Sequence, residues 1–272
     1  MPELPEVETI KNELLPYLIN RKFTGVTICD SRLISQPLVE EFCRKLPGQI
    51  ITDIQRRGKY LIFYLSHGEK LLMHLRMTGV LLINSDPPDR YIRASFRFDD
   101  GNELFFVDFR RLGVVWLVED EEAIIGKLGT EPLSDGFTAE LLARLLHNRQ
   151  APIKAVLLDQ TIIAGIGNMY ADEALFEAKI HPMRKAGSLS SVEVGALYMA
   201  INDVLKLAID RKGASVSDYA RPGGERGTAQ TGFCVAHKLG QACQVCGTAI
   251  QRIKVRNRGT YFCPFCQKDK QV

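Results

Sequence analysis

Apolar residues recur at steps of three and four positions close to the start of the chain. Val7, Ile10, Leu14 and Leu18 follow this spacing, and most positions between them are polar. This period is typical of one face of an amphipathic helix. The pattern therefore predicts a helix from Pro5 to Leu18.

Short apolar runs follow the helix, separated by turn signals such as those at residues 66–68 and 99–101. Runs of this length, bounded by Gly, Asp and Ser, are typical of strands. So many short strands predict an antiparallel sandwich or barrel. The predicted strands cover residues 26–29, 50–55, 60–65, 71–75, 80–83, 95–98, 103–107 and 114–118.

The pattern becomes helical beyond residues 129–132, so we place a domain boundary near residue 131. Residues 213–232 are rich in Gly and Ser and weakly apolar, which predicts a long loop that is functional or mobile. The predicted helices cover residues 139–146, 153–158, 169–178 and 192–211.

Composition limits the classes of protein that this chain can belong to. Its 272 residues leave room for two domains, and its net charge of +3 requires any nucleic-acid surface to come from local clustering. No long apolar run and no apolar signal segment is present, so we expect neither a membrane span nor secretion. In a reducing cytosol, the seven cysteines need an explanation other than disulfides.

Four of these cysteines have the spacing of a zinc site. Cys243 and Cys246 form one Cys-x2-Cys pair, and Cys263 and Cys266 form a second pair, with sixteen residues between the two pairs. This pattern predicts two knuckles that bind one zinc ion through four thiolates, with two disulfides or a redox pair as alternatives. Because cysteines would fill all four positions, we expect a structural zinc ion.

Basic residues gather on the same segment, opposed by a single acid. A run of charges is often a solvated face, but on a zinc-bound hairpin we favour a surface that contacts phosphates. The basic residues are Arg252, Lys254, Arg256, Arg258, Lys268 and Lys270, and the acid is Asp269.

The N-terminus offers a nucleophile. If Met1 is removed, Pro2 becomes a free secondary amine with the carboxylate of Glu3 beside it. An α-amino group has a pKa of about 7.7–8.0, against about 10.4 for Lys, so roughly a tenth or more of such amines are unprotonated at neutral pH. Such an amine can form a Schiff base. Pro2 and Pro5 also fit a helix start, and both interpretations can hold together.

Three further groups have both a chemical and a structural interpretation. Lys59 opens an apolar strand, where it could reach solvent or act as a positioned acid. Asn168 follows a glycine turn and is a candidate N-cap of a helix start that holds phosphate, or part of an ordinary helical hairpin. Met77, Arg110 and Leu112 suit a wedge for a gap in a base stack, with core packing as the alternative for Met77 and Leu112.

Together these segments closely resemble the formamidopyrimidine-DNA glycosylases, bacterial repair enzymes for oxidised purines. The start PELPEVE and the stretch AGIGNMYADEAL are the most specific motifs, and Leu4 favours this branch over the related endonuclease VIII branch. The resemblance spans the chain in order, over residues 1–8, 57–61, 74–79, 108–113, 164–184 and 243–267.

The resemblance implies roles for the reacting groups. Pro2 would attack the sugar C1′ atom of a flipped nucleotide, and Glu3 would act as acid and base in ring opening and Schiff-base formation. Lys59 would assist β-elimination and contact phosphate, and Arg258 would assist δ-elimination and bind DNA. The 213–232 loop would cover the damaged base.

The resemblance also implies the DNA contacts. Lys154 and Asn168 would hold phosphates around the lesion, while Met77 and Arg110 would enter the space left by the flipped base. The remaining matched positions include departures from the family. Leu112 stands where Phe is common, and Tyr91 and Arg93 stand in place of a His-x-His pattern but are still expected to contact DNA. Arg149 and His74 lie at positions of expected DNA contacts.

We therefore expect an α+β multidomain protein. A helix and an antiparallel β-sandwich would form the catalytic domain (1–131), followed by a helix-two-turn-helix region (132–232) and a zinc-finger hairpin (233–272). We expect a cytoplasmic, monomeric glycosylase and AP lyase that acts on damaged or abasic double-stranded DNA, with zinc as its only metal. The alternatives are an oxidised-pyrimidine glycosylase of the endonuclease VIII type and a catalytically silent damage-binding protein of the same fold.

Overall fold

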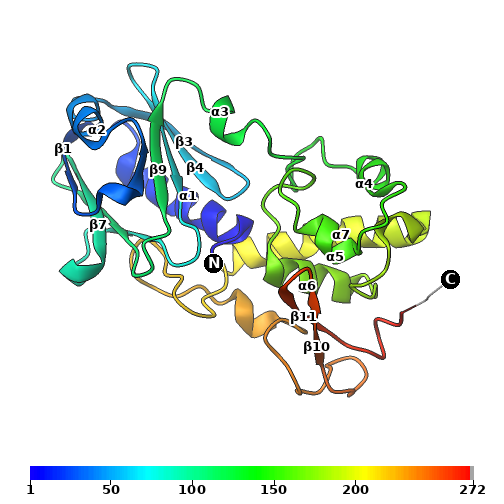
Figure 1. Cartoon of the computed structure of the whole chain (residues 1–272). Coiled ribbons are helices and arrows are strands. Elements are labelled where there is room, and N and C mark those ends of the chain that lie inside the picture. Colours follow the sequence, from blue (N-terminus) through cyan, green and yellow to red (C-terminus); the bar gives the residue numbers. More distant parts are fainter. Residues whose placement is uncertain (270–272) are drawn as a thin grey trace. The chain divides into compact units, whose positions relative to one another are not determined.

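The computed structural model describes residues 1–269 and divides the chain into two compact units (Figure 1). The first unit comprises residues 1–127 and 209–230, and the second begins at residue 128, continues to 208 and resumes at 231. The expected division placed residues 209–232 with the helical region. It differs because residues 209–230 return to the first unit, where they bond to its first helix. Lys270, one of the predicted basic residues, lies outside the described residues.

Helix α1 (Leu4–Leu18) opens the first unit much as the apolar spacing predicts. Pro5 stands in its first turn, and Glu6 accepts a hydrogen bond from the backbone N–H of Glu3, the N-cap residue, at 2.7 Å. The apolar stripe of α1 is buried against the sheets. This burial, which removes apolar surface from water, is what holds the helix in place.

Two sheets follow, one of five strands in the order β2-β9-β5-β4-β3 and one of four strands in the order β1-β7-β8-β6. Their inner faces and α1 share one core that contains Phe63, Phe96 and Phe106. The strands are β1 (Phe23–Ile28), β2 (Ile34–Gln36), β3 (Ile51–Arg57), β4 (Tyr60–Leu65), β5 (Lys70–His74), β6 (Val80–Ile83), β7 (Ile92–Phe98), β8 (Glu103–Val107) and β9 (Val114–Val118).

Two short elements of this unit were not predicted. Strand β2 pairs with β9 in parallel, whereas the sequence predicted purely antiparallel sheets. Helix α2 (Val39–Lys45) also has no counterpart among the predicted helices. Strand β2 has three residues and α2 has seven. Segments this short do not show a hydrophobic period that would distinguish them from a loop.

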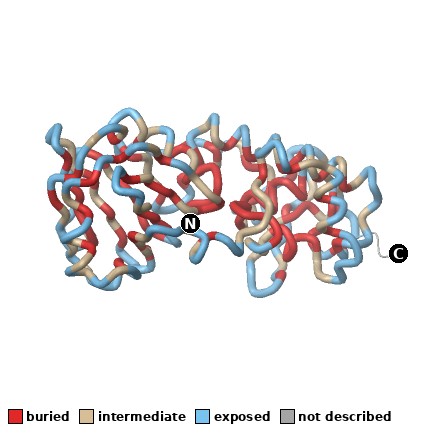
Figure 2. The backbone as a smooth tube through the Cα atoms, turned by 90° about the horizontal axis from the view of Figure 1, so that it is seen from above, coloured by how far each residue is buried: buried red, intermediate tan, exposed pale blue. Residues whose placement is uncertain are grey.

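The second unit is mainly helical and ends in a two-stranded antiparallel hairpin. Helix α6 begins at Asn168 with Gly167 as its N-cap, so the prediction that Asn168 is the N-cap is wrong by one residue. Figure 2 shows buried positions within each unit and exposed ones along the loops. The elements are α4 (Ala139–Leu146), α5 (Ile153–Leu157), α6 (Asn168–Glu177), α7 (Ser191–Asp210), β10 (Gln251–Val255) and β11 (Arg258–Phe262), with the short α3 (Glu122–Ile125) at the end of the first unit.

Among the described residues, no helix has the length and apolar character that crossing a membrane requires.

Candidate active site and zinc centre

The start of α1 places the candidate nucleophile and its acid in a protected position. Pro2 is buried and Glu3 is only 2% exposed, whereas Met1 is exposed. The carboxylate of Glu6, fully buried, accepts hydrogen bonds from the N–H of Glu3 through one oxygen and from the N–H of Ala214 through the other, at 2.7 and 2.8 Å. Glu6 therefore holds both the backbone beside Pro2 and the first residues of the 213–232 loop.

Arg56 links this helix to the turn that carries Lys59. Its Nε atom lies 2.7 Å from a carboxylate oxygen of Glu8 on α1, and its Nη1 atom donates to the carbonyl of Gly58 at 3.1 Å. Burial raises the pKa of Glu8, but hydrogen bonds from Lys11 and Arg56 outweigh that effect and lower it. Lys59 follows directly and is 8% exposed. The structure thus brings Lys59 and α1 into one bonded frame.

His74 ends β5 as a buried, neutral imidazole. Its Nδ1 atom accepts a hydrogen bond from the N–H of Arg76 at 2.9 Å, and its ring meets the edge of Tyr60. Burial lowers the pKa of His74 to about 3, and the charges of Arg76 and Lys59 act in the same direction. A contact between this side chain and a DNA phosphate would therefore be made by a neutral N–H donor.

The three candidate wedge residues come from two loops that join the sheets. The first crossover (residues 75–79) carries Met77, and the second crossover (residues 108–113) carries Arg110 and Leu112. All three side chains are exposed, and a guanidinium N–H of Arg110 donates to the Met77 sulfur at 3.3 Å. Because both side chains are exposed, Met77 and Leu112 do not pack in the core, which was the alternative interpretation.

Two other predicted DNA contacts lie beside the second crossover. Arg93 is 6% exposed and donates to the carbonyls of Asp108 and Arg90, at 2.6 and 3.0 Å. These two bonds use two of the five guanidinium N–H donors and fix the position from which Arg93 would contact a phosphate. Tyr91 is partly buried, with Arg90 over its ring and Phe109 against its edge.

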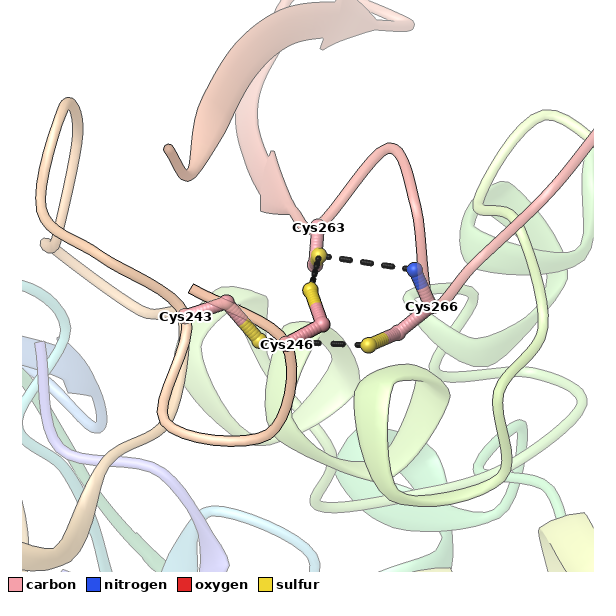
Figure 3. Close-up of side chains that lie close together, drawn as sticks. All are labelled: Cys243, Cys246, Cys263 and Cys266. Carbon is pink, nitrogen blue, oxygen red and sulfur yellow. Dashed lines mark hydrogen bonds between the residues drawn. The ribbon is translucent and has the colours of Figure 1, made fainter. Parts of the chain in front are cut away.

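The four predicted zinc ligands converge (Figure 3). Their sulfur atoms all lie within 4.8 Å of one another, with 3.9 Å between Cys243 and Cys266 and 3.4 Å between Cys246 and Cys263. Four Zn–S bonds of about 2.3 Å in a tetrahedron separate sulfurs by about 3.8 Å. A disulfide requires about 2.05 Å, and all seven cysteines are free. The residues fit one structural zinc ion.

The hairpin beyond the first zinc knuckle presents Arg258. Val255 pairs with Arg258, and the two residues between them, Arg256 and Asn257, both have positive φ angles, as a tight type I′ turn requires. Arg258 is exposed at this turn. Its position next to the turn makes it available to a phosphate backbone.

A buried ion pair holds the residues that follow Arg258. Lys154 and Asp172 are 0 and 1% exposed, and the Nζ atom of Lys154 lies 2.7 Å from the Asp172 carboxylate. Lys154 also donates to the Thr260 hydroxyl at 2.8 Å, and the Asp172 carboxylate accepts from the Tyr261 N–H at 3.0 Å. Burial raises the pKa of Asp172, opposed by the Lys154 charge. Lys154, for which a phosphate contact is predicted, thus bonds to the hairpin within the protein.

The other two predicted contacts in this unit differ in exposure. The amide of Asn168 donates to the Gly259 carbonyl at 3.0 Å, so it too secures the Arg258 turn. Arg149 is exposed, and its Nε atom donates to the Leu145 carbonyl at 2.6 Å. Arg149 thus presents its charge at the surface, whereas Asn168 is partly buried.

Four buried acids of the structure were given no role from the sequence. They are Glu6, Asp108, Asp172 and Glu173, which accept hydrogen bonds from backbone N–H groups. Glu173 bonds to three consecutive N–H groups, those of residues 234–236, at 2.7–2.8 Å. Burial raises its pKa against the effect of these donors. For Glu173, the available signal was an acidic residue inside an apolar helix pattern, which marks a carboxylate that needs buried donors.

The fold and site define a DNA-lesion enzyme with a zinc-bound hairpin, and comparisons with known proteins agree. The formamidopyrimidine-DNA glycosylase N-terminal domain matches residues 1–115, and the H2TH domain of the same enzymes matches 128–220. The zinc finger found in FPG and IleRS matches residues 240–268.

Full-length relatives show the same correspondence. The formamidopyrimidine-DNA glycosylase of Pelotomaculum thermopropionicum is 43% identical over 99% of this chain and 100% of its own length. Solved structures of the Lactococcus lactis Fpg cover 98% of this chain and 100% of that protein. They hold DNA with an abasic site (34% identity, TM-score 0.91), Fapy-dG in a single-residue mutant (34%, 0.92) or an oxidised pyrimidine (34%, 0.90). This chain belongs to the formamidopyrimidine-DNA glycosylase family.

Proposed function

We propose that this chain excises oxidised purines, such as 8-oxoguanine and formamidopyrimidines, from double-stranded DNA and then cleaves the strand at the abasic site. It is a bifunctional DNA glycosylase and AP lyase of base excision repair, with one structural zinc ion. It would work in the compartment that holds the DNA, which in a bacterium is the cytoplasm. The bonded frame that joins α1 to the Lys59 turn through Arg56 is the observation that carries the proposal.

The first step uses the N-terminal amine. After removal of Met1, the lone pair of the Pro2 nitrogen forms a bond to C1′, and the glycosidic bond breaks with its electron pair leaving on the base, which takes up the proton that the Pro2 nitrogen releases. Cleavage of the C1′–O4′ bond then opens the sugar, and Glu3 supplies the proton that O4′ takes up. Because Pro2 is a secondary amine, the product is a cationic iminium ion, a Schiff base between Pro2 and the sugar.

The second step breaks the strand. The iminium ion withdraws electrons from C2′, so a base removes the C2′ proton and the 3′ phosphate leaves by β-elimination. A second elimination expels the 5′ phosphate. Lys59 and Arg258 are our candidates for assisting the two departures, because each is a cation at a position to which the family resemblance gives that role. The 213–232 loop would cover the extruded base, which must leave the stack before it can react.

Borohydride trapping tests the proposal directly, because hydride reduces the iminium ion to a stable amine adduct. Protein with Met1 removed, as verified by mass spectrometry, should form a covalent adduct with an 8-oxoguanine:C duplex. The control is the same protein with one extra residue retained before Pro2, which should form none. If the processed protein gives no adduct although it binds the duplex, the chain is a damage-binding protein and the proposal is wrong.

An oxidised-pyrimidine glycosylase is the second candidate, since the Lactococcus lactis Fpg has been solved with such a lesion. Binding alone does not separate the two, so the rates of excision must be compared. We expect faster single-turnover excision from 8-oxoguanine:C than from thymine-glycol:A duplexes. The opposite order would assign this chain to the pyrimidine lesions.

A further inference from the structure

The two crossovers run side by side in opposite directions between the sheets. The first leads from β5 in the five-stranded sheet to β6 in the four-stranded sheet, and the second leads from β8 back to β9. His74 pairs with Val114, and Val80 pairs with Val107, so the ends of both crossovers are in register. Two strand ladders therefore fix the crossovers next to each other.

One carboxylate organises the space beneath them. Asp108 has no exposed surface. One of its oxygens accepts hydrogen bonds from the Thr78 hydroxyl and from the N–H of Arg110, the latter at 3.1 Å. The other oxygen accepts from the N–H groups of Leu112 and Gly113, each at 2.8 Å. Asp108 thus shapes its own crossover and bonds to a side chain of the other.

The backbone of Asp108 is held as well. Its N–H donates to the Tyr91 carbonyl at 2.9 Å, and its carbonyl accepts from the Arg93 guanidinium at 2.6 Å. Little room remains around it, because a Cβ atom on Gly113 would lie 2.5 Å from the Phe106 ring. Such a fully bonded, close-packed group is rigid.

The outer surface of the same crossovers is apolar and basic. Met77, Phe109 and Leu112 are 41, 48 and 40% exposed, and Arg110 bonds to the Met77 sulfur. Apolar side chains with an adjacent cation are the groups that fill a gap in a base stack and contact its phosphates. The rigid bonding lies directly under the surface that would enter DNA.

We propose that Thr78 and Asp108 are positioning residues that join the two crossovers into a single wedge for base extrusion. The proposal rests on the proposed function. A wedge replaces a stacked base only if its parts keep their spacing while the neighbouring bases press on them. The bond from the Thr78 hydroxyl to Asp108 resists that separation, because a hydrogen bond to a buried charged group is among the stronger ones.

A matched pair of variants at one position tests this role. Thr78→Val keeps the shape of the side chain and removes the hydroxyl, whereas Thr78→Ser keeps the hydroxyl. Both are made in the zinc-loaded full chain with Met1 removed. Two reactions are compared, excision from an 8-oxoguanine:C duplex and borohydride trapping on a duplex with a preformed abasic site, which has no base to extrude. A 2-aminopurine beside the lesion reports the opening of the stack by its fluorescence.

We expect Thr78→Val to slow excision about tenfold or more, the scale of one hydrogen bond to a charged group. Trapping on the abasic duplex should fall much less, and the 2-aminopurine signal should rise more slowly. Thr78→Ser should stay near the wild type in all three measurements. Asp108→Asn, which converts one acceptor into a donor, should show the same selective loss in a more severe form.

Two outcomes would overturn the proposal. In the first, Thr78→Val and Thr78→Ser excise the base at the same rate. In the second, Thr78→Val loses excision and abasic trapping equally, which would make the bond purely structural. Failure of the proposed function is recognised separately, because the wild-type protein itself would then form no trapped adduct.

Discussion

The buried carboxylate of Glu6 accepts a hydrogen bond from the backbone N–H of Ala214, 208 residues further along the chain, at 2.8 Å. Its other oxygen accepts from the N–H of Glu3. A single side chain therefore stabilises both the helix start that carries the candidate nucleophile and the loop that would cover its substrate. Because Glu6 belongs to α1, the bond to Ala214 makes the position of the loop depend on that helix.

We expect Glu6→Gln to destabilise the fold by about 1–3 kcal/mol, because one of two buried donors loses its acceptor. The loop at residues 213–230 should also become sensitive to protease. Glu13→Gln is the control, since Glu13 pairs with Arg221 of the same loop but both side chains are partly exposed. It should cost about 1 kcal/mol or less. Urea unfolding measures both, and equal effects would contradict the role given to Glu6.

Gly213 is the second point at which this loop is held. Its φ angle is +77°, and a Cβ atom there would lie 2.9 Å from both the Glu6 side chain and the Tyr219 ring. Gly213→Ala should therefore cost more than the roughly 1–2 kcal/mol of a left-handed residue alone. Gly224→Ala separates the two effects, because Gly224 has a φ of +93° and open space around it. Comparable melting temperatures for the two variants would contradict the steric argument.

Zinc should hold the hairpin in its DNA-binding form. Cys263→Ser removes one of four ligands, so we expect loss of bound zinc by atomic absorption and weaker binding to a duplex with a tetrahydrofuran abasic analogue. Cys234→Ser is the control, because Cys234 lies near the site but outside the set of four converging ligands. Unchanged affinity in a zinc-free Cys263→Ser protein would refute the role of the hairpin.

Removal of Lys154 should expose the dependence of the Arg258 turn on its buried ion pair. Lys154→Met leaves the Asp172 carboxylate without its cation, which destabilises proteins by about 3–5 kcal/mol. The loss should grow from pH 5 to pH 8, because the buried carboxyl has a raised pKa and its protonated form is tolerated at the lower pH.

The double variant Lys154→Met with Asp172→Leu removes both charges and should recover most of the stability at pH 8. Its affinity for DNA should remain below that of the wild type, because the bonds to Thr260 and Tyr261 are still missing. Full affinity in the double variant would show that the pair does not position the turn.

His74 should make the free energy of unfolding depend on pH below about 6.5. Its folded pKa of about 3 lies below the ordinary value of 6.5, so the unfolded state binds the proton first as the pH falls. Stability is therefore unaffected above pH 6.5 and decreases by about 1.4 kcal/mol per pH unit between 6.5 and 3. The difference between wild type and His74→Asn in urea unfolding at pH 7.5 and 5.5 isolates this effect. No change in that difference would mean that His74 is not held neutral.

Local spacing was sufficient for some of these features. The period of Val7, Ile10 and Leu14 predicts α1, and the spacing of the four cysteines predicts ligands that do converge. Both signals are short motifs, one within a single helix and the other in two Cys-x2-Cys pairs. The family resemblance then connected them to a function.

Long-range partners account for what the sequence could not reveal. Lys154 sits among apolar residues, but its burial depends on Asp172 and on a hairpin more than a hundred residues away. Arg93 is buried, and its guanidinium donates to the carbonyl of Asp108, fifteen residues further along the chain. A charged residue in a sequence does not show whether its partner will be water, DNA or the backbone of another strand.

The return of residues 209–230 to the first unit has a consequence for synthesis of the chain. The segment between the two parts of that unit contains most of the helices of the second unit, so the first unit is complete only after residue 230 has left the ribosome. Until then, Glu6 and Glu13 cannot form their bonds to Ala214 and Arg221. Since domains generally fold as they emerge, the sheets can form early, whereas the site acquires its loop near the end of translation.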